Sequence, residues 1–307
     1  MSRPAHRGAE QAVRDRVPDI EVLAERLNGV DYLADEGLAT ALFLALRLPQ
    51  PLLLEGEAGV GKTEAGKALA SSLETPLIRV QCYEGIDSAE VLYEWNYPRQ
   101  LLRIRMAEAS GEEIVEESLF SDHYLIRRPL LEAIEHQGPL PAVLLIDELD
   151  RADDDFEAFL LELLAESSIT IPEIGTVRAT HTPIVVLTSN RTRDLHDALK
   201  RRCLYHWIDY PEPQREVEIV RRRVPSAARE LAVDVAEAVG RLRREEVQKP
   251  PGIAEAIDWV AALQLLGVQR LDVDSAGRTL GAVLKYREDQ ELMRQRGLDS
   301  VVGAGNG

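Results

Sequence analysis

The chain has 307 residues, of which 45% are hydrophobic and 29% are charged, a composition typical of a soluble globular protein. Its 36 Lys and Arg stand against 53 Asp and Glu, and the resulting net charge of −17 argues against general binding to nucleic acid or to anionic membranes. The two cysteines and six histidines are scattered, which indicates a reducing compartment and argues against disulfides or a zinc site. Because we find neither a signal peptide nor an apolar run long enough for membrane insertion, we expect a cytoplasmic protein.

The chain up to residue 208 alternates helical and strand patterns. Residues 1–18 are polar and without pattern, so we expect a loose lead-in there. Alternation around Gly175 predicts a hairpin at 169–179. Because helical patterns separate the predicted strands, we expect parallel pairing and an α/β fold with helices on both faces of one sheet. The predicted helices lie at 20–27, at 36–46 and after Thr63, and the predicted strands at 52–54, 77–80, 143–146, 184–187 and 204–208.

The C-terminal part of the chain has a helical pattern almost throughout. Pro211 and Pro213 mark the boundary, and helical stretches follow at 215–223, 227–244, 253–266 and 274–296. The Gly-rich end at 303–307 is expected to be disordered. We therefore divide the chain into a lead-in (1–18), an α/β core (19–212), a helical domain (213–296) and a flexible tail (297–307).

One segment predicts a phosphate-binding loop. Its sequence, Gly56-Glu57-Ala58-Gly59-Val60-Gly61-Lys62-Thr63, matches the pattern G-x-x-x-x-G-K-[ST] and lies between a predicted strand and a predicted helix. Glycines allow backbone N–H groups to surround phosphate oxygens, Lys62 would reach the β- and γ-phosphates, and the Thr63 hydroxyl would bind Mg²⁺. The alternative is a chance Gly-rich turn, but the strand and helix on either side favour a site for ATP and Mg²⁺.

Two carboxylates follow the apolar strand predicted at 143–146. Asp147 and Glu148 should lie beside the phosphate loop, since ligands gather at the carboxyl ends of parallel strands. Asp147 is the expected outer-shell partner of Mg²⁺, and Glu148 the expected base for the attacking water, a role worth roughly 10²–10⁴-fold in rate. The alternative for Asp147 is a helix N-cap, a role that Asp150 also suits.

Two further polar positions suit nucleotide chemistry. Asn190, at the end of the fourth predicted strand, would bind the attacking water or the γ-phosphate, or would simply form a turn. Arg201 and Arg202 follow shortly after. An arginine supplied across a subunit interface stabilises the transferring phosphoryl group by roughly 10³–10⁵-fold. The alternative is a solvated basic helix end.

In this order, the phosphate loop, the Asp-Glu pair, the strand-end Asn and the arginine pair, followed by a helical domain, resemble an AAA+ ATPase from about residue 20 to about residue 296. The stretches 52–63 and 145–152 resemble the MoxR group more narrowly, and 81–85, 93–98 and 201–205 resemble its CoxD-like subgroup. Members of that subgroup accompany molybdenum-containing carbon monoxide dehydrogenase-type enzymes.

The resemblance implies an AAA+ P-loop NTPase core of three αβα layers with a C-terminal helical lid. It makes residues 56–63 the Walker A loop, Asp147 and Glu148 the Walker B pair, Asn190 sensor 1, and Arg202 the arginine finger. It also implies a homo-oligomer, a hexameric ring, and a partner with a von Willebrand factor A domain. The chain departs from the family at Ala254, where a sensor 2 arginine is usual, so we assign no sensor 2.

The sequence leaves two questions open. Aromatic residues gather at Tyr83, Tyr93, Trp95 and Tyr97, where they either contact a client protein or pack against the core. The function is either ATP-driven remodelling of a client enzyme, such as assembly of a metal centre in a molybdenum hydroxylase, or nucleotide-gated recruitment by a ring scaffold. A DNA-processing AAA+ motor is disfavoured by the charge of −17, and a small-molecule kinase by the helical lid and the arginine pair.

Overall fold

The computed structural model describes residues 4–113, 115–166 and 168–303. They divide into two compact units. The first unit is made of the described residues of Met1–Val30, Ala34–Glu55 and Thr63–His206, and the second of those of Asp31–Leu33, Gly56–Lys62 and Trp207–Gly307. The domain boundary expected at residues 212–213 stays a prediction. No helix in the described ranges is both long enough and apolar enough to cross a membrane.

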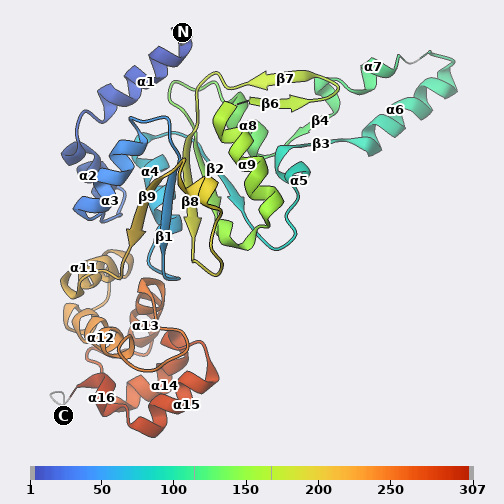
Figure 1. The fold of residues 1–307 in the computed structure, drawn as a ribbon. Coiled ribbons are helices and arrows are strands. Elements are labelled where there is room, and N and C mark those ends of the chain that lie inside the picture. The colour runs from blue at the N-terminus through green and yellow to red at the C-terminus, as the bar shows by residue number, and fades with distance from the viewer. Residues whose placement is uncertain (1–3, 114, 167, 304–307) are drawn as a thin grey trace. The chain divides into compact units, whose positions relative to one another are not determined.

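A five-stranded sheet forms the framework of the α/β part of the chain (Figure 1). Its strand order is β2-β5-β8-β1-β9. The pairs β2–β5, β5–β8 and β8–β1 are parallel, so the carboxyl ends of these four strands meet at one edge. All five strands predicted from the sequence are confirmed, and with them the α/β class. Their bounds are β1 (Leu52–Gly56), β2 (Leu77–Gln81), β5 (Val143–Asp147), β8 (Ile184–Ser189) and β9 (Leu204–Ile208).

Helices cover both faces of the sheet, as the continuous apolar strands predict. Alternate side chains of β5 point to opposite faces. Leu144 and Ile146 belong to a core that includes apolar side chains of α8 (Pro129–Glu135) and α9 (Asp154–Glu166). On the other face, Leu145 packs so closely on Gly66 of α4 (Lys62–Leu73) that a Cβ at Gly66 would lie 3.0 Å from Leu145 Cδ1. The core is therefore a three-layer αβα arrangement.

The expected loose lead-in is wrong for residues 4–16, which form helix α1 (Pro4–Arg16). Ala9 and Val13 of this helix and Val17 directly after it are buried at four-residue spacing, so they form an apolar stripe. The stripe is too sparse to stand out in a polar sequence, and tertiary burial stabilises the helix. The predicted helices at 20–27 and 36–46 are confirmed as α2 (Ile20–Gly29) and α3 (Glu36–Ala45).

A long connection separates β2 from β5 and carries a small antiparallel ribbon of β3 and β4. Figure 1 shows α6 and α7 extending from this ribbon away from the sheet. The predicted hairpin before β8 is confirmed as β6 (Ser168–Ile171) and β7 (Gly175–Arg178). Before α8, the connection contains α5 (Ser88–Leu92), β3 (Tyr93–Trp95), α6 (Tyr97–Ser110), α7 (Glu116–Leu119), the 3₁₀ helix η1 (Asp122–Tyr124) and β4 (Leu125–Arg127).

The C-terminal part of the second unit is helical, as predicted. Its core centres on Trp259, which is fully buried and donates from Nε1 to Thr279 Oγ1 at 2.7 Å. The single helix expected at 274–296 is two helices, because the chain turns at the buried Leu284, which has an extended backbone. The helices are α11 (Pro213–Arg223), α12 (Arg229–Leu242), α13 (Ile253–Leu265), α14 (Val273–Val283), α15 (Arg287–Arg296) and α16 (Asp299–Val302).

Helix α16 lies within the expected flexible tail, and that expectation is wrong for residues 299–302. Val301 and Val302 are buried in the helical core, which orders the chain there. The expectation for residues 304–307 lies outside the described residues.

Candidate functional site

The phosphate loop has the backbone that its glycines predict. Gly59 and Gly61 have φ angles of +78° and +99°, which residues other than glycine rarely adopt. Lys62 is 6% exposed, and its Nζ donates to the carbonyl oxygens of Gly56 at 2.8 Å and Glu57 at 2.6 Å. Lys62 therefore folds back over the loop, and its ammonium group lies among the backbone groups that are predicted to surround a phosphate.

In the second unit, the start of α13 lies against this loop. The Ile253 N–H donates to the Gly59 carbonyl at 3.0 Å. A Cβ at Gly252 would lie 2.8 Å from Gly59 Cα, so a glycine is required for this approach. Glu255 Oε2 accepts from Gly252 N at 2.9 Å. The sequence does not indicate this backbone contact, and the position nearby where the family usually has an arginine is Ala254.

Arg243 holds the turn before α13. Its guanidinium donates to both carboxylate oxygens of Glu216 at 2.7 Å and to the Pro251 carbonyl at 2.8 Å. It also stacks on the Tyr210 ring, 4.2 Å from the centroid. Burial raises the pKa of the Glu216 carboxyl, while the Arg243 charge opposes that rise. This pair fixes the position of Pro251 and, through it, the start of α13.

In the first unit, Asp147 at the carboxyl end of β5 accepts hydrogen bonds from the hydroxyl groups of two threonines. Asp147 is 1% exposed. Thr63 Oγ1 donates to it, at 2.8 Å from Oδ1 and 3.0 Å from Oδ2, and Thr188 Oγ1 donates to Oδ1 at 2.5 Å. The structure thus brings the two predicted magnesium residues, Thr63 and Asp147, into contact. Carboxylate and hydroxyl oxygens are the ligand chemistry that Mg²⁺ prefers, so these residues fit the ion.

Arg79 of β2 also contacts this carboxylate. Its Nε and Nη2 lie 3.1 Å and 2.5 Å from Asp147 Oδ2. Sequence reasoning missed both Arg79 and Thr188. Thr188 directly follows the apolar run of β8, and that polar strand end was a usable signal, whereas Arg79 lies within a short strand and gave none.

Glu148 has an unusual backbone for a residue with a side chain, with φ at +54°. Such a conformation costs about 1–3 kcal/mol and persists where neighbouring groups enforce it. Here the Glu148 N–H donates to Thr188 Oγ1 at 2.9 Å. The half-buried carboxylate pairs with Arg151 Nη1 at 3.1 Å.

The helix-cap alternative considered for Asp147 and Asp150 is wrong. Helix α9 is capped by Asp153, whose Oδ1 accepts from Phe156 N at 2.9 Å. Neither of the other two carboxylates is needed for that purpose, because each has donors of its own at the strand ends.

Asp150 is buried and fixes the turn that carries Asn190. Its carboxylate accepts from Asn190 N at 3.1 Å, Thr192 N at 2.9 Å and Thr192 Oγ1 at 2.7 Å. Between them Arg191 has φ at +56°, so the turn is tight. The backbone of Asn190 is therefore held at the carboxyl end of β8, the same sheet edge as Asp147.

Arg202 lies apart from this group of side chains. It is exposed in the connection between α10 (Asp197–Lys200) and β9, and its Nη1 donates to the Leu161 carbonyl of α9 at 3.0 Å. Arg201 beside it is also exposed. The structure therefore does not bring Arg202 to the strand-end carboxylates of its own chain.

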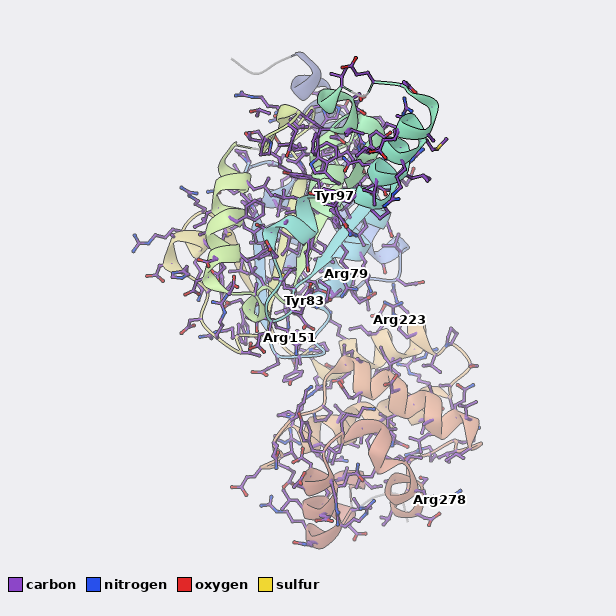
Figure 2. All side chains as sticks on the ribbon, turned by 90° about the vertical axis from the view of Figure 1, so that its right-hand side faces the viewer. Arg79, Tyr83, Tyr97, Arg151, Arg223 and Arg278 are labelled. Atoms are coloured by element: carbon purple, nitrogen blue, oxygen red, sulfur yellow. The ribbon has the colours of Figure 1, made fainter. Side chains whose placement is uncertain are left out.

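The aromatic cluster divides into buried and exposed members. Trp95 is 4% exposed and packs edge-to-face on Phe120, with ring centroids 5.2 Å apart. The core-packing alternative is therefore correct for Trp95. Tyr83 and Tyr97 are exposed, Tyr83 in the chain after β2 and Tyr97 at the start of α6 (Figure 2).

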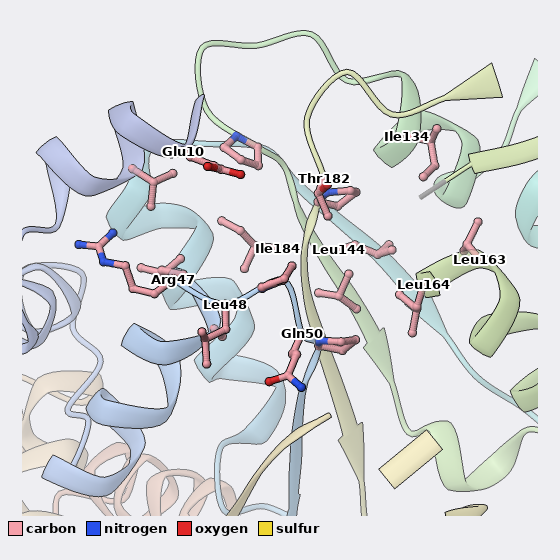
Figure 3. A pocket seen from close by; sticks show the side chains of 18 of the residues that line it. Glu10, Arg47, Leu48, Gln50, Ile134, Leu144, Leu163, Leu164, Thr182 and Ile184 are labelled. Carbon is pink, nitrogen blue, oxygen red and sulfur yellow. The ribbon is translucent and has the colours of Figure 1, made fainter. Parts of the chain in front are cut away.

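A separate pocket of about 190 Å³, lined mainly but not only by apolar residues, lies in the first unit (Figure 3). Leu144 and Ile184, at the amino ends of β5 and β8, line it together with Leu48 and Leu163. Since Asp147 is at the opposite end of β5, the cavity and the strand-end carboxylates are distinct sites.

Parts of this chain are similar to known proteins. Residues 51–203 match the family model described as the AAA domain (dynein-related subfamily). The chain is 27% identical over 179 residues to Protein NorQ of Paracoccus denitrificans, a match covering 56% of this chain and 57% of NorQ. It is 26% identical over 250 residues to the chloroplastic chaperone protein ClpB3 of Arabidopsis thaliana, covering 79% of this chain and 21% of ClpB3. The chain thus spans only part of the length of either relative.

Among solved structures, the Thermotoga maritima RuvB Holliday junction branch migration motor is similar, at 17% identity and a TM-score of 0.48. That match covers 80% of this chain and 68% of the RuvB chain. The family match includes the phosphate loop, and it also includes β5 and β8 with their polar ends. Residues 51–203 of this chain form an AAA+ ATPase domain.

Proposed function

We propose that the protein binds Mg²⁺-ATP at residues 56–63 and hydrolyses it. The observation that supports this most strongly is the contact of the Thr63 hydroxyl with both Asp147 oxygens. Thr63 is the last residue of the phosphate loop, so the residues proposed to bind the metal and those proposed to bind the phosphates adjoin in the sequence. Bound Mg²⁺ would neutralise charge on the phosphate oxygens. Lys62 would turn from the loop carbonyls to the β- and γ-phosphates.

Glu148 is the proposed base that orients and deprotonates the attacking water. The Glu148 N–H donates to the Thr188 hydroxyl, which donates in turn to Asp147, so one hydroxyl group links the Glu148 backbone to the Asp147 carboxylate. For that role the Glu148 side chain must leave Arg151, and its half-exposed position permits this. Asn190 is the proposed second partner of the water or the γ-phosphate.

At the level of the whole protein, we propose a cytoplasmic, MoxR-type chaperone-like factor that acts as a hexameric ring. Similarity to NorQ and to a chaperone, ClpB3, supports this direction. The exposed Arg202 is free of the strand-end carboxylates of its own chain and suits a role as arginine finger for a neighbouring subunit. The CoxD-like resemblance adds a molybdenum hydroxylase as the client and a protein with a von Willebrand factor A domain as the partner.

The Glu148→Gln variant tests this proposal. It should bind ATP with unchanged affinity, while phosphate release falls by about 10²–10⁴-fold. Glu64→Gln, which removes a carboxylate from the surface ion pair with Lys67, is the matched control and should keep full turnover. If Glu148→Gln still matures the client, hydrolysis is dispensable and the nucleotide-gated scaffold is the better description.

Subunit mixing tests the ring. Arg202→Ala subunits added to wild-type protein should lower the turnover per wild-type subunit, because each finger serves a neighbour. Arg99, an exposed residue of α6, provides the control substitution. A rate that falls only in proportion to dilution would show that Arg202 does not act between subunits.

A further inference from the structure

Asp147 has a charged partner that a magnesium site does not require. Its side chain is 2% exposed, so its negative charge is removed from water and needs compensation within the protein. Thr63 and Thr188 supply two hydroxyl donors, but both are neutral. The charge is balanced by Arg79, which donates twice to one oxygen, Oδ2.

Arg79 can leave this contact, whereas Asp147 cannot. The Arg79 side chain is 42% exposed and lies on β2, the outermost strand on its side of the sheet (Figure 2). Its Nη2 also donates to Gln81 Oε1, which is on the same strand and exposed. Gln81 is the register partner of Asp147, so the guanidinium can shift toward solvent without losing every acceptor.

We propose that Arg79 is a resident cation that occupies Asp147 in the metal-free protein and competes with Mg²⁺ for it. This inference rests on the proposed function. Oδ2 cannot accept two N–H groups of Arg79 and at the same time serve a magnesium ion or its bound water, and the two cations repel each other. Arg79 therefore stabilises the buried Asp147 carboxylate when no metal is bound and raises the Mg²⁺ concentration needed for binding.

Two consequences differ in sign, and together they separate competition from ordinary structural support. Replacing Arg79 by Met removes the charge and keeps much of the length. Without the competing cation, the site should bind the metal more tightly. Without a countercharge for Asp147, the metal-free protein should be less stable. If Arg79 only held Asp147 in position for the metal, its replacement would lower both the metal affinity and the stability of the protein.

The first arm of the test measures metal affinity directly. Mn²⁺ is titrated into protein saturated with a non-hydrolysable ATP analogue, and free Mn²⁺ is followed by electron paramagnetic resonance. Arg79→Met should bind Mn²⁺ about two- to fivefold more tightly than wild type, given the modest strength of ion pairs with one partly exposed partner, and Arg79→Lys should lie between them. The control is Arg103→Met, which removes the exposed ion pair with Glu112 and should leave the Mn²⁺ affinity unchanged.

The second arm uses neither nucleotide nor metal. Urea unfolding in EDTA is measured for Arg79→Met, for Asp147→Asn and for the double variant. Arg79→Met should raise the unfolding equilibrium constant about two- to fivefold when Asp147 is present. It should have little effect when combined with Asp147→Asn, because the neutral amide needs no countercharge. Equal effects in both backgrounds would overturn the charge pairing.

The outcomes distinguish this inference from the proposed function. Unchanged or weaker Mn²⁺ binding by Arg79→Met, with normal binding by wild type, overturns the competition and leaves ATP hydrolysis standing. Wild-type protein that takes up no Mn²⁺ with nucleotide overturns the proposed function and the competition together.

Discussion

Removing the Asp150 carboxylate should loosen the turn that carries Asn190. Asp150→Ala deletes the acceptor of three hydrogen bonds, two from backbone N–H groups and one from the Thr192 hydroxyl. Bonds to a charged acceptor are worth about 1.5–3 kcal/mol each and do not add fully. Because Thr192 is exposed, water replaces part of the loss, and we expect the free energy of unfolding to fall by about 2–4 kcal/mol.

The turnover of this variant tests the proposed role of Asn190. Phosphate release should fall by about 10²-fold, the usual effect of losing one positioned hydrogen-bonding group, while ATP affinity stays unchanged. The control is Asp153→Ala, which removes the cap of α9 only, costs about 1 kcal/mol and should keep full turnover. If Asp150→Ala were as stable and as active as Asp153→Ala, the argument that this carboxylate positions the turn would be refuted.

Three further predictions concern packing and reactivity. Gly252→Ala should weaken ADP binding and destabilise the protein by about 1–3 kcal/mol, since the added Cβ would collide with the phosphate-loop backbone. The control is Gly240→Ala, because the Cβ position at Gly240 is open, and equal ADP affinities of the two variants would contradict the contact. Burial, with nearby carboxylates, raises the pKa of the Cys82 thiol to about 12. Iodoacetamide at pH 8 should therefore label Cys82 far more slowly in the folded protein than in urea, and similar labelling rates would refute its burial. Trp95→Ala should lower the free energy of unfolding by about 3–5 kcal/mol, whereas Tyr97→Ala should change it by less than about 0.5 kcal/mol. Urea unfolding measures both changes, and equal losses would contradict the assigned burial.

The sequence predicts the sheet well because each strand is a short apolar run with a clear boundary. Val143–Asp147 illustrates this, since its four apolar residues and terminal carboxylate indicate both the buried strand and the edge where Asp147 lies. Once the strands are parallel, the meeting of Thr63 with Asp147, 84 positions further along the chain, follows from the topology.

The misses depend on contacts that no local pattern encodes. Helix α1 owes its stability to three small or branched apolar residues that find a tertiary surface. In the sequence, Arg79 has the pattern of an ordinary polar residue in an outer strand. It lies beside Asp147 only because of the register of β2 against β5. Asp150 fits a helix cap by position, but the carboxyl end of β8 provides better donors.

Calorimetric titration of Mg²⁺-ADP into wild-type protein and into Lys62→Met tests the central claim most directly. The loop predicts one site per chain in the wild type, lost or greatly weakened in the variant because the buried ammonium group is gone while the fold is retained. No heat of binding with the wild type, or equal affinity for both proteins, would contradict a nucleotide site at residues 56–63.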